Sequence, residues 1–135
     1  PDNVYAVGDS GTVLHFDGGS WRRMATPTQL LLRGIWGSGP RDIFAVGERG
    51  VILRYDGVRW YQMPSPTDLA LRTVWGTAPT DVYAAGEGGI LLRFDGARWS
   101  ILPSPTDKLL IQLWGSGSSY FAVGTVATIL RGSRP

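Results

Sequence analysis

Short apolar segments alternate with turns rich in glycine and proline along the whole chain of 135 residues. Each segment holds four to eight residues, is rich in Val, Ile, Leu, Phe, Tyr or Trp, and is bounded by Gly, Pro, Asp or Ser. This is the pattern of β-strands. Glycines interrupt every stretch that is long enough for an ordinary helix. The sequence therefore predicts an all-β protein.

The segments recur in a fixed order with a period of 39 residues. One unit consists of LLLRGIWG (30–37), DIFAVG (42–47), VILRYDG (51–57) and RWYQMP (59–64), and the next unit repeats all four segments. Without a gap, residues 40–78 and 79–117 are identical at 20 of 39 positions. Four antiparallel strands repeated at this period are typical of a β-propeller, in which each small sheet is one blade and packs against its neighbours.

The units divide residues 1–135, which we interpret as a single propeller domain or a fragment of one, into four blades. The first blade lacks the first segment of the unit, and the last blade lacks the fourth. The predicted blades are residues 1–28, 29–67, 68–106 and 107–135. Either one chain closes as a small four-bladed ring, or several chains complete a larger one. Because open sheet edges and unmatched blade faces favour association, we expect a homo-oligomer, with a dimer as the simplest case.

The turn between the third and fourth segments repeats the dipeptide Asp-Gly, with its aspartates at Asp17, Asp56 and Asp95. Asp-Gly supplies the positive φ values of a tight hairpin, and the aspartate bonds its own turn backbone. Repeated aspartates also raise the question of calcium, but no D-x-D-x-D spacing is present. We predict structural aspartates, no metal site and no cofactor.

Tryptophans mark two positions of the unit. They end the first segment at Trp36, Trp75 and Trp114, and they open the fourth at Trp21, Trp60 and Trp99. Exposed rings at repeated positions can stack on sugars or cations. A tryptophan at the same place in every blade is more typical of packing between blades, and we interpret all six as structural.

The repeat resembles those of known propellers. The stretch DVYAAGEGGILLRFDGARW (81–99) and its copies are similar to repeats of bacterial β-propellers, including photosystem-assembly-factor propellers and propeller segments of secreted bacterial proteins. The D-G-x-x-W part is also similar to the Asp-box hairpin of sialidases, but its Asp-to-Trp distance of four residues departs from that motif, and the serine two residues before the Asp is missing. The resemblance implies a propeller fold over nearly the whole chain and leaves the function open.

Candidate ligand-binding residues occupy the turns between the second and third segments. Asp9, Glu48 and Glu87 stand at equivalent positions there, and Arg49 follows Glu48. On a propeller these turns lie on one rim, beside the proline-rich connectors between blades. A rim of acids can bind a cation or a basic ligand, which makes these four residues the ligand-binding candidates, but acids in such turns more often serve to keep the turns soluble. His15, the only histidine, has arginines at its equivalent positions, and we predict no catalytic residue.

Charge and composition exclude several partners. The net charge is only +2, and the basic residues, nearly all arginines, are spread through the repeats, so we predict no nucleic-acid interface. No apolar run approaches the length of a membrane span, and the chain has no cysteine. These features leave the location open, with an extracellular or periplasmic one favoured for a natural protein.

Several functions compete on these grounds. The leading hypothesis is a non-catalytic propeller that binds or scaffolds a protein or glycan, with repeated loops that favour a multivalent ligand. The alternatives are a purely structural, self-assembling repeat protein without a ligand, natural or engineered, and a propeller lectin. A fragment of a sialidase-like enzyme is least favoured, because Arg33 and Arg72 are its only suggestive arginines and the third copy has Ile111.

Overall fold

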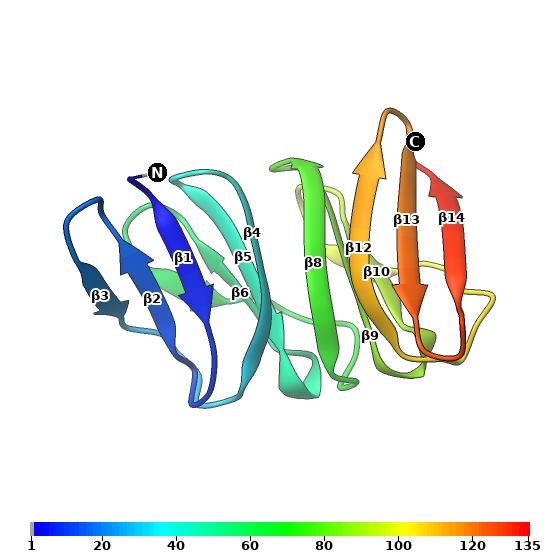
Figure 1. Ribbon diagram of the computed structural model, residues 1–135, viewed down its shortest axis with the longest axis horizontal. Helices are drawn as coiled ribbons and strands as arrows, with labels where there is room; N and C mark the ends of the chain where they lie inside the picture. Colours follow the sequence, from blue (N-terminus) through cyan, green and yellow to red (C-terminus); the bar gives the residue numbers. More distant parts are fainter. Residues whose placement is uncertain (1) are drawn as a thin grey trace.

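The computed structural model describes residues 2–135, which form four antiparallel sheets (Figure 1). The first sheet consists of β1 (Val4–Val7), β2 (Val13–Phe16) and β3 (Trp21–Met24). The second consists of β4 (Leu32–Gly39), β5 (Asp42–Gly47), β6 (Ile52–Tyr55) and β7 (Trp60–Gln62). The third consists of β8 (Leu71–Ala78), β9 (Asp81–Gly86), β10 (Leu91–Phe94) and β11 (Trp99–Ile101). The fourth consists of β12 (Leu110–Ser116), β13 (Ser119–Gly124) and β14 (Ile129–Ser133).

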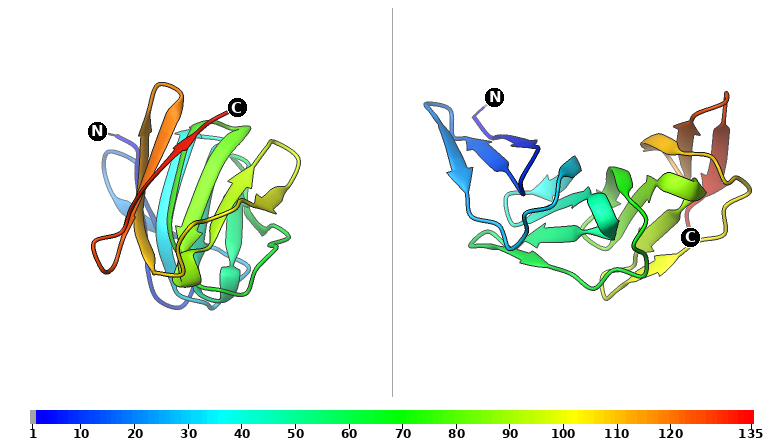
Figure 2. Two further views of the ribbon diagram at one scale, coloured as in Figure 1. Left: turned by 90° about the vertical axis from the view of Figure 1, so that its right-hand side faces the viewer. Right: turned by 90° about the horizontal axis from the view of Figure 1, so that it is seen from below.

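The four sheets stand side by side along an open arc (Figure 2). In each sheet the strands follow chain order, so that β4, β8 and β12 lie toward the concave side and β7 and β11 lie on the convex side. The first and last sheets lie at the two ends of the arc, apart from each other. The predicted all-β propeller architecture, with partial first and last blades, is therefore confirmed. The chain does not close as a four-bladed ring.

The first strand of each unit differs in its bounds from the sequence prediction. It covers 32–39 and 71–78, whereas the pattern indicates 30–37 and 69–76. Most of the expected loop WGSGPRD is strand, because β4 and β5 remain paired as far as Gly39 and Asp42 and turn through only two residues. At the other end, Leu30 belongs to the connector: its N–H donates to the Thr28 hydroxyl, and its carbonyl accepts from the N–H of Gly11.

The apolar core lies between the sheets, in three layers. Phe44 of the second sheet meets Phe94 and Trp99 of the third, with ring centroids 5.4 and 5.9 Å apart. The layer between the first two sheets contains Val13, Ile43 and Trp60, and that between the last two contains Tyr83, Leu113 and Tyr120. Each fully buried large side chain contributes about 1.5–3 kcal/mol. The neighbouring sheet therefore supplies much of the stability of each blade.

Tryptophans within β4 and β8 reach across to the next sheet. Trp36 lies over Gly76, where an added Cβ would stand 2.8 Å from the ring, and Trp75 lies over Gly115 at 2.2 Å. Only glycine leaves room for these rings, because any side chain would occupy the same space. The tryptophan of each Trp-Gly dipeptide thus packs against the following sheet, and the glycine leaves room for the tryptophan ring of the preceding sheet.

The last sheet has exchanged the sizes of two facing residues. Tyr120 of β13 covers Gly132 of β14, where an added Cβ would meet the Tyr120 ring at 2.0 Å. The equivalent pair in the third sheet is Val82 and Phe94, with the large ring on the other strand. Each pair thus contains one large ring, which comes from β13 in the last sheet and from β10 in the third. The degenerate sequence of the last copy therefore still forms the same layer.

Candidate binding site

The turns between the second and third strands of the units lie on one edge of the arc, beside the connectors. They contain the short 3-10 turns η1 (Glu48–Gly50) and η2 (Glu87–Gly89). Two ion pairs stand on this edge, which we call the turn rim: Arg33 Nη2 lies 2.6 Å from Glu48 Oε1, and Arg72 Nη2 lies 2.9 Å from Glu87 Oε1. The glutamates of the rim are therefore neutralised by the inner strands.

A β-bulge places each of these arginines. In β4 the pairing passes from Leu32–Gly47 to Gly34–Val46, so that Arg33 is the extra residue. Arg72 is the extra residue at the same point of β8. A bulge re-aims the side chain of its extra residue. Sequence reasoning did not select Arg33 and Arg72 for the rim, although each arginine precedes its glutamate by the same number of residues, which was the signal available.

The four residues predicted to bind a ligand lie on the turn rim but do not converge. Glu48 and Glu87 are on different sheets, each bound to its own arginine. Asp9 and Arg49 are exposed, and Arg49 has a left-handed backbone with φ of 53°. In the last sheet the pair is absent, since Ile111 and Thr125 occupy the equivalent positions. The rim is a row of separate charge pairs.

The opposite edge carries a second row of polar pairs, one in each sheet, with members twelve residues apart. They are Asn3–His15, Asp42–Arg54, Asp81–Arg93 and Ser119–Arg131. The two middle sheets use charged pairs, whereas the end sheets use neutral or singly charged ones. His15 also stacks on Tyr5, with centroids 4.4 Å apart. This contact and its bond to Asn3 give the histidine a structural environment.

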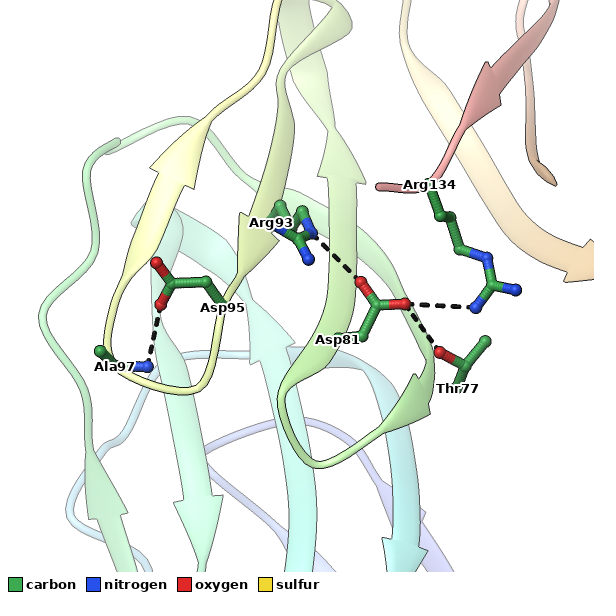
Figure 3. A network of polar contacts seen from close by, with 6 residues as sticks. All are labelled: Thr77, Asp81, Arg93, Asp95, Ala97 and Arg134. Carbon is green, nitrogen blue, oxygen red and sulfur yellow. Dashed lines mark hydrogen bonds and ion pairs between the residues drawn. The ribbon is translucent and has the colours of Figure 1, made fainter. Parts of the chain in front are cut away.

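Asp81 is the centre of a larger network (Figure 3). It accepts hydrogen bonds from Thr77 at 2.7 Å and from Arg93 at 3.1 Å, and Arg134 of the chain end reaches it at 3.2 Å. Burial raises the pKa of the Asp81 carboxyl, but the hydrogen bonds from Thr77 and Arg93 outweigh burial and lower the pKa below its usual value. Asp81 thereby ties the third sheet to the C-terminal segment of the fourth.

The hairpin aspartates all make the same local bonds. One carboxylate oxygen of Asp17 accepts from the N–H groups of Gly19 and Ser20, at 3.0 and 2.9 Å. Asp56 and Asp95 accept from the second and third residues after them in the same way. These backbone bonds lower the pKa of all three carboxyl groups. Each aspartate therefore stabilises its own hairpin turn.

The exposure of the tryptophans differs between the middle sheets and the end sheets. Trp60 and Trp99 are each 5% exposed, between sheets. Trp21 is 51% exposed and Trp114 is 42% exposed, and these two lie on opposite end sheets. The exposed rings therefore do not form a repeated aromatic platform on one edge.

Two cavities open between the sheets. One of about 300 Å³ lies between the first two sheets and is lined by Tyr5 of β1, by Ile43 of β5 and by Ile35 and Gly37 of β4. The other, of about 290 Å³, lies on the outer side between the Pro64–Pro66 connector and Trp99. Among residues 2–135, no group of three His, Asp or Glu side chains is placed to hold a metal. Over the same residues, no helix reaches the length and hydrophobicity of a membrane span.

Comparison with solved structures supports the fold. A structure of YCF48 bound to D1 peptide matches with a TM-score of 0.72 and 22% identity, covering 92% of this chain and 44% of that one. YCF48 from Cyanidioschyzon merolae matches with a TM-score of 0.68 and 18% identity, covering 100% of this chain and 53% of that one. No family model and no curated protein matches the sequence. The fold is that of part of a β-propeller, and the chain spans about half the length of either YCF48 chain.

Proposed function

We propose that this protein is a non-catalytic propeller module that binds a protein segment on its turn rim. The rim offers charges of both signs at fixed spacing, and Arg33 and Arg72 are the bulge residues of β4 and β8, which are strands on the concave side of the arc. A guanidinium held by one carboxylate keeps donors free for a second acceptor. The observation that carries the proposal is this pair of bulged arginines. A solved protein of similar fold with a bound peptide supports it.

A library of immobilised random peptides tests the binding. We expect the wild-type chain to select a subset of peptides, and the double variant Arg33→Ala/Arg72→Ala to bind that subset about tenfold or more weakly. The matched control is Arg22→Ala/Arg59→Ala, which removes two exposed arginines from the outer part of the sheets. Equal loss in both double variants, or no selection by the wild type, contradicts the proposal. A glycan array run in parallel tests the lectin alternative.

The two ends of the arc support a second part of the proposal, in which a further copy extends the ring. Phe121 of the last sheet occupies the position of Phe44, and it stacks on the partly exposed Trp114. Phe16 and Trp21 of the first sheet occupy the positions of Phe94 and Trp99, with centroids 5.4 Å apart. The two outer faces therefore repeat the chemistry of the layer between the middle sheets. Such a contact is head to tail and generates a ring if the rotation closes.

Light scattering tests this association. The chain has a mass of 14.7 kDa, and we expect a larger species in the wild type. Trp21→Asp places a charge on one end face and reduces the mass to that of the monomer. Val58→Asp is the control, because Val58 is 85% exposed on a hairpin of the second sheet. A wild-type chain that stays monomeric at high concentration refutes the association and leaves the rim proposal intact.

A further inference from the structure

The cavity on the outer side of the arc lies between the second and third sheets, which both have all four strands. Its volume is about 290 Å³, and its wall consists of residues 63–66, which follow β7, and residues 97–99, which lead into β11. Proline, methionine, alanine and tryptophan side chains make most of this wall apolar. An apolar cavity of about 150 Å³ is large enough to bind benzene. This one therefore has room for one ring or for two fused rings.

Trp99 brings a buried hydrogen-bond donor to the wall. Its side chain is 5% exposed, and among residues 2–135 its indole N–H has no hydrogen-bond partner. A buried indole N–H usually has one, and an unpaired donor is costly. The other polar side chains of the wall do not accept this bond: the Ser65 hydroxyl is bonded to Thr67 at 3.1 Å, and Arg98 is exposed and has only donors. An acceptor from another molecule would satisfy the N–H.

The layer between the first two sheets shows the direction of this N–H. There Trp60, the equivalent of Trp99, donates its indole N–H to Met24 Sδ at 3.4 Å. The two rings have the same orientation: each packs on the aromatic residue that ends the preceding strand, with centroids 5.4 and 5.5 Å apart and planes at 34°. Met63 is the equivalent of Met24, 39 residues further along, and it lines the cavity. The Trp99 N–H is therefore directed to the Met63 side of the cavity.

Ala97 and Met63 give this layer its space. Ala97 lines the cavity, whereas the equivalent residue of the second sheet is the larger Val58. The backbone N–H of Met63 is bonded to the Ile52 carbonyl at 2.9 Å, so its side chain alone is free to move. Methionine has three rotatable bonds and adapts to irregular gaps. The wall can therefore adjust to an occupant without a change of the backbone.

We propose that this cavity is a binding site for a small, uncharged ring compound with one carbonyl group. The ring fills the apolar space, and the carbonyl oxygen accepts a hydrogen bond from the Trp99 N–H. A charged group is a poor occupant, because it would lose its hydration beside a buried ring. A single water molecule is also poor, because a buried water requires about three polar partners and the buried side chains of the wall offer one.

The two methionines of the chain, Met24 and Met63, provide the measurement. With ¹³C-labelled methionine methyl groups, one NMR spectrum reports on both layers. The probe is acetophenone, and the matched control is ethylbenzene, which has nearly the same shape without the carbonyl. We expect acetophenone to shift the Met63 signal saturably with a Kd on the order of 1 mM, and to leave the Met24 signal in place. Ethylbenzene binds about fivefold more weakly, because it leaves the N–H unpaired.

The variant Trp99→Phe tests the donor. It keeps an aromatic ring in the layer and removes the N–H, so acetophenone loses its advantage over ethylbenzene. The matched control is Trp60→Phe, which removes the equivalent N–H, already bonded to Met24. It retains the preference for acetophenone.

The variant Ala97→Phe tests the cavity without a change in the core. Ala97 is exposed on the hairpin, so the variant keeps the wild-type thermal midpoint, while the larger side chain fills the cavity and abolishes binding. Val58→Phe is the matched control at the equivalent position of the second sheet, where the side chain is 85% exposed. It retains binding.

Four results overturn the proposal: no saturable Met63 shift up to about 10 mM acetophenone, equal shifts of Met24 and Met63, equal affinity for the two compounds, or unchanged binding in Ala97→Phe. The rim proposal is tested separately, because Arg33 and Arg72 do not line this cavity. Arg33→Ala/Arg72→Ala retains acetophenone binding, and Trp99→Phe retains peptide selection. Failure of one proposal is therefore distinguishable from failure of the other.

Discussion

The third sheet and the first sheet contain the same motif in different surroundings. In the third, Phe94 and Trp99 are buried against the second sheet, at 1% and 5% exposure. In the first, the equivalent Trp21 is half exposed and its face meets no other sheet among the described residues. The difference shows that the aromatic side chains of this motif are not buried by their own sheet alone. A neighbour must supply the opposite face, and the same side chain has a different energetic weight in each sheet.

Removing the tryptophan from each sheet gives the largest expected difference. Trp99→Ala leaves a cavity between two packed sheets and lowers the free energy of unfolding by about 3–5 kcal/mol. Trp21→Ala in the monomer removes a half-exposed ring and costs less than about 1 kcal/mol. Urea denaturation measures both. Equal losses in the two variants would show that the first sheet is covered in solution.

A glycine-to-alanine pair probes the inner strands. In Gly86→Ala the new methyl group collides with the Ala70 carbonyl at 2.0 Å, which forces a backbone shift and costs about 1–3 kcal/mol. Gly8→Ala has no such neighbour and leaves the stability unchanged. Thermal unfolding of the two variants beside the wild type measures the contrast. Equal losses in the two variants would contradict this explanation.

The polar pairs give a smaller contrast. Asp81→Asn weakens the bonds from Arg93 and Arg134 and costs about 1–2 kcal/mol, because the pair is largely shielded from water. Ser119→Ala loses one neutral acceptor at an exposed site, with an effect below about 0.5 kcal/mol. Chemical denaturation at low and high salt distinguishes them. Equal effects would show that Asp81 does not tie the last two sheets together.

The smallest expected effect is a pH dependence shared by all sheets. The pKa values of Asp17, Asp56 and Asp95 are lowered in the folded chain, so their contribution is present above the ordinary value near 4 and is lost as the pH falls through the lowered values. Replacing all three by asparagine keeps an acceptor for the turn amides and flattens the decline in thermal midpoint below pH 4. If the single variants at positions 17 and 95 differed, the hairpins would depend on neighbouring sheets.

The sequence predicts the sheets well because strands and turns are local features. Alternating apolar residues, Asp-Gly dipeptides and the 39-residue period indicate each hairpin without knowledge of the whole. The rim was predicted less completely. Asp9, Glu48, Arg49 and Glu87 were selected, but Arg33 and Arg72 reach the glutamates only because a bulge shifts them by one residue. A bulge depends on the pairing of two strands, so it cannot be predicted from the sequence of one segment alone.

The burial of individual residues also lay beyond the sequence. Identical tryptophan positions gave one interpretation for all six rings, yet Trp21 and Trp114 face outward at the ends of the arc. Likewise, the pattern placed the inner strands two residues early, because apolar Leu30 and Leu31 precede the pairing. Their backbone groups bond the turn of the preceding sheet and the turn of their own sheet. Both differences arise from contacts between units that no single unit encodes.

The position of glycine directly after tryptophan has a consequence for how such a chain lengthens. Each unit contains both the tryptophan that packs against the following sheet and the glycine that leaves room for the tryptophan of the preceding sheet. A tandem duplication of one unit therefore creates a matched contact at the new junction without any further substitution. Arrays of different length are accessible by copying alone, and sequence drift is restricted most at this dipeptide.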